Sequence, residues 1–159
     1  MHWALAALVA GSAAFCLLVV VAARRYRSVA PPRAMRLEPV SILKPLAGAD
    51  EGLEDNLRSF FEQDHQGGFE VLFAVREESD PAVPIVRSLQ ARFPQVPSRL
   101  MIVGEPPYPN AKVWSLDHMT HAASHDLLAM CDSDIRVDES FLRTVAAEIE
   151  DPNLADRKS

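Results

Sequence analysis

The chain has 159 residues, 48% of them hydrophobic and 24% charged, and its formal net charge at pH 7 is −6. The charge is unevenly distributed, because residues 1–44 hold six basic side chains and one acidic, whereas residues 45–159 hold ten basic and 21 acidic. Nucleic-acid binding requires a basic surface on the folded part, so this distribution argues against a nucleic-acid partner. A basic N-terminal segment (residues 1–44) that precedes an acidic domain suits an anionic membrane surface instead.

Residues 3–23 form an apolar segment of 21 residues without a charged side chain. At about 1.5 Å rise per residue, a helix of that length covers the roughly 30 Å hydrocarbon core of a bilayer. A cleaved secretory signal is the alternative, but such a signal carries its positive charge before the apolar run. Here five arginines follow the run, at positions 24, 25, 27, 33 and 36. The positive-inside rule then predicts a single transmembrane anchor at residues 1–23, a basic cytoplasmic linker at residues 24–39 and a cytoplasmic domain after it.

The rest of the chain alternates between strand and helix patterns. Apolar runs predict strands at residues 40–45, 69–75 and 99–103, and a fourth strand that ends at Cys131. Helical spacing predicts four helices, the first capped by Asp50, the second beginning near Pro81, and the last two at residues 111–123 and 139–150. Such alternation is typical of parallel βαβ units. We therefore expect residues 40–150 to form an α/β domain with a doubly wound parallel sheet, and residues 151–159 to form a polar tail.

Two carboxylates, Asp132 and Asp134, follow an apolar run that predicts a buried strand. Divalent cations such as Mg2+ or Mn2+ prefer oxygen ligands, and carboxylates at positions i and i+2 can address one ion directly or through water. A cation held in this way can neutralise a phosphate, which is the chemistry of a nucleotide-sugar site. The alternative is an ordinary solvated loop, because strand ends are often acidic.

Four features fall at the carboxyl edge of the predicted sheet, where sheets of this kind bind ligands. They are the loop at residues 45–49, which begins with Pro45, the loop at residues 77–80, the segment at residues 110–112, and the pair Asp132 and Asp134. Each has a simpler explanation: a strand-to-helix turn for the first loop, a helix N-cap for Asp80, and a solvated helix residue for Lys112. Their convergence favours a ligand site.

The histidines and cysteines predict no metal site. His118, His121 and His125 are near neighbours on the predicted helix and after it, but they lack the partner carboxylate of a zinc-protease pattern. We expect a surface or packing role for them. Cys16 and Cys131 lack metal-ligand spacing and are poor candidates for a disulfide, which is consistent with a reducing compartment.

Six segments, in this order and spacing, resemble the ceramide glucosyltransferase family (glycosyltransferase family 21) and its bacterial relatives in hopanoid biosynthesis. They are residues 40–48 (VSILKPLAG), 56–64 (NLRSFFEQD), 69–75 (FEVLFAV), 80–82 (DPA), 110–113 (NAKV) and 131–136 (CDSDIR). The match extends over roughly residues 1–150. No single segment is decisive, but the set is fairly specific.

The resemblance implies a GT-A fold, an N-terminal anchor, a UDP-sugar donor, a lipid acceptor of the ceramide or hopanoid type, and a divalent cation. It implies that Asp80 contacts the nucleotide, with Pro45 and Lys112 also in the nucleotide-sugar site, and that Asp132 serves the metal and the diphosphate. Asp134 stands where ceramide glucosyltransferases often have glycine, which completes a D-x-D pair of metal ligands. Ser115 departs from the family, which usually has asparagine there.

The resemblance also implies parts that this sequence does not contain. The family's catalytic base is a third aspartate well downstream of the D-x-D, together with a Q/R-x-x-R-W motif, and nothing marks Asp138, Glu139 or Asp151 as a substitute. We therefore expect the chain to be the donor-binding half of an enzyme, inactive alone and completed by a C-terminal part. A non-catalytic module that binds nucleotide or a membrane partner is the alternative. A phosphoacceptor domain is disfavoured, because the first strand ends in Lys44, Pro45 and Leu46 without an acidic pair.

Overall fold

The structure, a computed structural model, describes residues 2–28 and 38–149. The chain divides into two compact units, residues 1–32 and residues 33–159, and each is described by itself. The predicted polar tail at residues 151–159 and most of the predicted linker lie outside the described residues.

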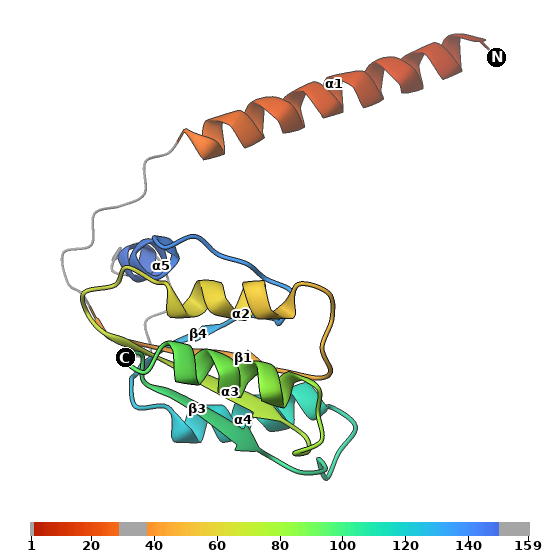
Figure 1. Cartoon of the computed structure of the whole chain (residues 1–159). Coiled ribbons are helices and arrows are strands. Elements are labelled where there is room, and N and C mark those ends of the chain that lie inside the picture. Colours follow the sequence, from red (N-terminus) through yellow and green to blue (C-terminus); the bar gives the residue numbers. More distant parts are fainter. Residues whose placement is uncertain (1, 29–37, 150–159) are drawn as a thin grey trace. The chain divides into compact units, whose positions relative to one another are not determined.

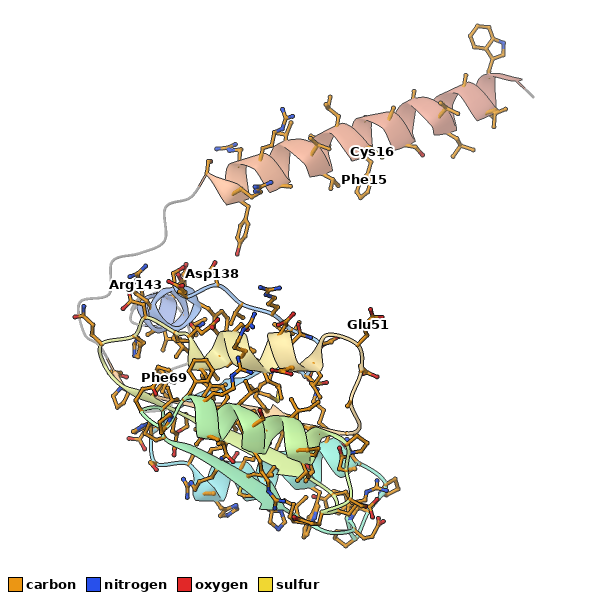
Figure 2. The ribbon with its side chains drawn as sticks, in the orientation of Figure 1. Phe15, Cys16, Glu51, Phe69, Asp138 and Arg143 are labelled. Carbon is orange, nitrogen blue, oxygen red and sulfur yellow. The ribbon has the colours of Figure 1, made fainter. Side chains whose placement is uncertain are left out.

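In the first unit the structure describes residues 2–28, which form the helix α1 (His2–Arg27) and end in a turn. The part from Trp3 to Arg27 has a mean hydropathy of 2.6, and no part of it is buried inside the structure. Its apolar side chains project outward all along the helix, as Phe15 and Cys16 do (Figure 2). The helix is therefore compatible with a membrane anchor by its length and composition. Its last turn carries three of the arginines that follow the apolar run.

The second unit is built on a parallel sheet of four strands in the order β3-β2-β1-β4 (Figure 1). The strands are β1 (Val40–Pro45), β2 (Phe69–Val75), β3 (Ser98–Ile102) and β4 (Leu127–Met130). In the central register Val40 lies opposite Phe69 on one side and opposite Leu127 on the other. The predicted α/β fold with a parallel sheet is confirmed.

Helices cover both faces of this sheet (Figure 1). One face packs against α2 (Leu53–Phe61), α3 (Ala82–Arg92) and α5 (Phe141–Ile149), and the other packs against α4 (Ala111–Ala122). Because side chains alternate along a strand, Val40 and Ile42 join the larger core under α2 and α3, whereas Leu43 joins the smaller core under α4.

Two expectations about these elements are wrong. Asp50 does not cap α2 with its side chain; the N-cap is Gly52, whose φ of 82° favours glycine, and Asp50 contributes only its backbone carbonyl to the turn. The strand β4 is not fully buried, because Leu128 and Met130 are 36% and 55% exposed. Among the described residues β4 pairs only with β1, and α4 packs over β1 and β2 rather than over β4.

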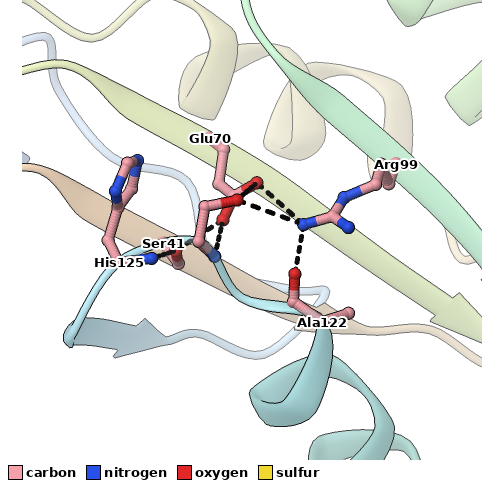
Figure 3. A network of polar contacts seen from close by, with 6 residues as sticks. Ser41, Glu70, Arg99, Ala122 and His125 are labelled. Carbon is pink, nitrogen blue, oxygen red and sulfur yellow. Dashed lines mark hydrogen bonds and ion pairs between the residues drawn. The ribbon is translucent and has the colours of Figure 1, made fainter.

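A polar network joins the amino-terminal ends of three strands to the loop between α4 and β4 (Figure 3). Glu70 of β2, which is 5% exposed, accepts hydrogen bonds from the Ser41 hydroxyl (2.7 Å), the Ser124 backbone N–H (2.6 Å) and the Arg99 guanidinium (3.1 Å). Burial raises the pKa of the Glu70 carboxyl, but these hydrogen bonds outweigh it and hold the pKa below its usual value.

Candidate functional site

A cavity of about 540 Å³ lies at the carboxyl end of the sheet. It brings together all five side chains that the sequence predicts for a ligand site, from segments as far apart as residues 45 and 134. The residues that line it are Pro45, Leu46, Ala47, Asp50, Arg76, Glu77, Asp80, Ala111, Lys112, Ser115, Asp132, Ser133 and Asp134.

The topology explains this convergence, because the carboxyl ends of parallel strands meet at one edge. Pro45 is the last residue of β1, and Asp132 stands two residues after the end of β4. The side chain of Asn110 caps α4 by accepting a hydrogen bond from the Val113 N–H at 3.1 Å. This cap places Lys112 in the first turn of α4, at the same edge.

Asp80 joins two of the loops that form the cavity. Its carboxylate accepts hydrogen bonds from the Gly48 N–H, at 3.0 and 3.2 Å to its two oxygens, and from the Ala82 N–H at 2.8 Å. Gly48 has a φ of 75°, which a residue with a side chain rarely adopts. The N-cap of α3 is Pro81 and not Asp80, but the Asp80 carboxylate still accepts the N–H of the first residue of the helix and also lines the cavity.

Asp132 forms an ion pair with Lys112, whose ammonium nitrogen lies 2.5 Å from the Asp132 carboxylate, and both side chains are about half exposed. Asp134 is exposed on the same turn and also lines the cavity. Among the described residues no group of three histidine, cysteine or acidic side chains is placed to hold a metal ion. The turn therefore offers two carboxylates, and a cation held there would need further oxygen ligands from its phosphate partner and from water. This donor set fits Mg2+, which proteins commonly bind through one or two carboxylates plus substrate phosphates.

Lys44 supports the turn that carries Asp132, although it does not line the cavity, and the sequence analysis missed it. Its side chain is completely buried at the end of β1, its ammonium group donates a hydrogen bond to the Asp132 backbone carbonyl at 2.5 Å, and it lies 3.9 Å from the centre of the Phe60 ring. Burial lowers the pKa of Lys44 to about 8, although the nearby acidic groups of Cys131, Asp132 and Asp134 work in the opposite direction.

Asn56 is the second missed residue, because its side-chain amide donates a hydrogen bond to the Ser133 carbonyl at 3.3 Å. For Lys44 the sequence holds a signal, namely a lysine inside an otherwise apolar strand at the same parity as Ile42.

The other candidate residues lie elsewhere. Asp138 and Glu139 line a separate pocket of about 690 Å³ beside α2 and α5, where Asp138 and Arg143 are seen in Figure 2. Hydrogen bonds from the hydroxyl and backbone N–H of Ser140 lower the pKa of Asp138. Asp151 lies outside the described residues.

The histidines make local contacts. The Nδ1 atoms of His118 and His121 lie within hydrogen-bonding distance of backbone carbonyls one turn earlier in α4, and His125 contributes its backbone N–H to the Ser41 hydroxyl. Cys131 is half-buried just after β4, and burial raises the pKa of its thiol.

Solved structures share the fold. The mannosyltransferase PcManGT from Pyrobaculum calidifontis, solved in complex with GDP-Man and Mn2+, aligns with a TM-score of 0.63 and 23% identity over 92% of this chain and 43% of its own. The S. aureus TarS 1-349 structure in complex with UDP-GlcNAc aligns with a TM-score of 0.55 and 19% identity over 70% of this chain and 31% of its own. The second unit therefore has the GT-A type of α/β fold.

Curated relatives are ceramide glucosyltransferases. Ceramide glucosyltransferase 1 of Caenorhabditis elegans is 37% identical over 99 residues, which is 62% of this chain and 21% of the relative. The ceramide glucosyltransferase of Komagataella phaffii is 32% identical over 110 residues, which is 67% of this chain and 21% of the relative. The chain thus spans about a fifth of the length of these relatives, in their N-terminal part. The family model of glycosyl transferase family 21 matches residues 2–156, and the chain belongs to that glycosyltransferase family.

Proposed function

We propose that this chain binds the diphosphate of a UDP-sugar together with Mg2+ or Mn2+, as the donor-binding half of a membrane-anchored glycosyltransferase. The observation that carries the proposal is the convergence of Pro45, Asp80, Lys112, Asp132 and Asp134 on one cavity at the carboxyl end of the sheet. The relatives named as ceramide glucosyltransferases, and the neighbours solved with GDP-Man and Mn2+ or with UDP-GlcNAc, support this choice of ligand.

Asp132 and Asp134 would hold the cation through their carboxylate oxygens. When bound, the ion supplies Lewis-acid stabilisation of the negative charge on the departing UDP, which is worth several kcal/mol in such reactions. The ion pair with Lys112 holds the Asp132 carboxylate at the edge of the cavity. Lys112 would then bind a phosphate oxygen, since its ammonium lies at the same edge of the cavity and can donate a charge-assisted hydrogen bond there.

Asp80 would orient the nucleotide. Its two oxygens accept backbone hydrogen bonds from Gly48 and Ala82, yet a carboxylate has about four acceptor positions and can still accept from a hydroxyl or N–H of the nucleoside. The loops that it joins are thereby fixed before the ligand binds. Pro45 contributes a rigid wall, because its φ is restricted by its ring.

Sugar transfer to a lipid acceptor belongs to the complete enzyme, in which a C-terminal part adds to the half described above. A lipid acceptor suits α1, which would hold the cavity near a bilayer surface, with the second unit on the cytoplasmic side. A second candidate is a module that binds nucleotide without turnover. It is favoured by one observation: Asp138 and Glu139, the carboxylates that follow the acidic pair in the described chain, line a different pocket and so are not placed to act as base at the cavity.

The test is a calorimetric titration of UDP into the full chain in detergent, with and without Mn2+. We expect Mn2+ to strengthen UDP binding, and Asp132→Asn to weaken UDP binding in Mn2+ by about 10- to 100-fold, because one ligand of the ion is lost. In buffer without the cation the two proteins should bind UDP with similar affinity.

Asp64→Asn is the matched control, because Asp64 is also exposed and also ion-paired, to Arg143 at 3.1 Å, but it lies in the other pocket. It should leave both affinities unchanged. Equal affinity of wild type and Asp132→Asn in Mn2+ would count against the proposal. Hexose transfer from UDP-sugar to a lipid, measured with the complementing part added, separates the transferase from the module without turnover.

A further inference from the structure

We propose that Lys44 is a positioning residue for the acidic turn at residues 131–135. It holds the backbone of this turn through the Asp132 carbonyl, so that Asp132 and Asp134 face the cavity together. This proposal rests on the proposed function, because that function assigns the cation to these two carboxylates. Lys44 itself would touch neither the cation nor the nucleotide, since it does not line the cavity.

Two successive carbonyls of the turn are held by side chains from other elements. The Lys44 ammonium donates to the Asp132 carbonyl at 2.5 Å, and the same carbonyl accepts the Ile135 N–H at 3.4 Å. The Asn56 amide of α2 donates to the next carbonyl, that of Ser133, at 3.3 Å. The backbone that carries Asp132 and Asp134 is therefore attached to β1 and to α2 as well as to β4.

Packing alone does not account for a lysine at this position. The side chain is 0% exposed and its ammonium lies against the Phe60 ring, so an unbranched apolar residue could fill the same space. Burying a charged group costs several kcal/mol, and replacing buried charges by apolar residues of similar volume is often neutral or stabilising. The ammonium group of Lys44 has a role that an apolar residue cannot fill. It binds a backbone carbonyl and places a positive charge near the carboxylates of Asp132 and Asp134.

Groups that orient metal ligands without touching the metal commonly contribute about 10- to 100-fold to metal affinity or activity. The backbone contact of Lys44 is of that kind, because a shift of the Asp132 carbonyl moves both carboxylates of the turn. Loss of the lysine should therefore weaken the cation-dependent part of ligand binding more than it weakens the fold.

The experiment compares Lys44→Met with wild type, using the full chain in detergent. The melting temperature and the UDP affinity with and without Mn2+ are measured for each protein. We expect the factor by which Mn2+ strengthens UDP binding to fall about tenfold or more, and this fall, rather than any change in melting temperature, is what the positioning role predicts. A residue that only supported the fold would lower the melting temperature and leave that factor unchanged.

Two further variants complete the design. Leu89→Val removes one methylene from a buried residue in the last turn of α3, and it should lower the melting temperature without changing the Mn2+ factor. Asn56→Ala removes the second attachment of the turn, and it should reduce the Mn2+ factor even if Lys44→Met does not fold. An unchanged Mn2+ factor in Asn56→Ala, and in Lys44→Met wherever it folds, overturns the positioning role alone. Absence of any Mn2+ effect in wild type overturns the proposed function and the positioning role with it.

Discussion

Asp132 meets two lysines in two different ways. Lys112, in the first turn of α4, pairs with its carboxylate, whereas Lys44, at the end of β1, binds its backbone carbonyl. The first contact is half-exposed and is screened by water, so it contributes little to stability. The second is buried and cannot be exchanged for water without exposing the core. The same aspartate therefore has a side chain free to change partners on a backbone that is held in place.

Replacing Lys112 by methionine is expected to change two affinities in opposite directions. Binding of Mn2+ alone should strengthen, because the ammonium no longer competes for the Asp132 carboxylate. Binding of UDP in Mn2+ should weaken by about 10- to 100-fold, because a charge-assisted hydrogen bond to phosphate is worth about 1.5–3 kcal/mol. Titrations of Mn2+ and of UDP in saturating Mn2+ measure the two effects.

Arg143→Met is the control for this experiment, because Arg143 forms a similarly exposed ion pair outside the cavity. It should change neither affinity. If Lys112→Met weakens both, the lysine orients Asp132 rather than competing for it, and the exchange of partners is wrong.

At the scale of the elements, the sheet is fixed at its amino-terminal end by Glu70 and open to ligand at its carboxyl end. The network around Glu70 joins β1, β2 and β3 to the loop that leads into β4 (Figure 3). The negative charge of Glu70 is compensated mainly by hydrogen bonds, because its ion-pair partner Arg99 is half-exposed. Removing that charge leaves buried donors without an acceptor of equal strength.

Glu70→Gln should lower the free energy of unfolding by roughly 1–3 kcal/mol at neutral pH, as expected for loss of hydrogen bonds to a buried charged group. The pKa of Glu70 is held below its ordinary 4.5 in the folded protein, so its stabilisation is complete above that value and is lost as the pH falls through the folded-state pKa. The difference between wild type and variant should therefore be constant near neutral pH and shrink below about pH 4.5. Urea unfolding at several pH values, followed by circular dichroism, measures it.

Glu62→Gln provides the comparison, because Glu62, the C-cap residue of α2, is about half exposed and is paired at 3.5 Å with Arg58, one turn earlier. Its unfolding free energy should stay within about 0.5 kcal/mol of wild type at every pH. A difference for Glu70→Gln that does not depend on pH would show that the carboxylate charge is not what the network stabilises.

The strands and the position of the candidate site could be predicted from the sequence, because they depend on patterns within short segments. The strands β1 and β2 were predicted at their observed bounds, and β3 within one residue, because their apolar runs end at proline or at polar turns. The convergence of the candidate site followed from strand topology alone. Asp50 was misassigned because the turn depends on the positive φ of Gly52, which the apolar spacing does not reveal.

The predictions that failed concern burial, which depends on contacts between residues far apart in the sequence. The exposure of Leu128 and Met130 depends on how many strands flank β4 and on which strands α4 covers, and no pattern within β4 contains that information. The burial of Lys44 likewise depends on the Phe60 ring, which closes over it from another element. The parity of Lys44 with Ile42 indicates the face of the sheet on which it lies, but only the packing of α2 shows that its ammonium group is covered.

At the scale of the whole chain, an apolar helix with arginines in its last turn precedes an acidic α/β unit. The exposed apolar surface of α1 has no partner inside the first unit, as far as the structure describes it, and its length matches a bilayer. Basic residues that follow a spanning segment tend to remain on the cytoplasmic side. This charge bias is the basis of the proposed orientation, in which the second unit lies on the cytoplasmic side.

This orientation can be tested in cells that express the full chain. The protein should stay with the membrane after carbonate extraction, and the second unit should resist protease added to intact cells but be cleaved in inside-out vesicles. Replacing Arg24, Arg25 and Arg27 by serine should reduce this asymmetry, because the charge bias that sets it is weakened.

The control replaces three arginines of the second unit by serine, at Arg87, Arg92 and Arg143. This change should leave the protease pattern as it is in wild type. Release of wild-type protein by carbonate would show that α1 does not span the membrane. Cleavage of the second unit in intact cells would show the opposite topology.

The network around Glu70 has a consequence for the distant cavity. Successive side chains of a strand point to opposite faces, so a slip of β1 by one residue against β2 would turn Lys44 toward the α4 face and separate Ser41 from Glu70. The hydrogen bonds at the amino-terminal end resist that slip and so preserve which way every β1 side chain points. Substitutions there can impair donor binding without altering a single residue that the donor would touch.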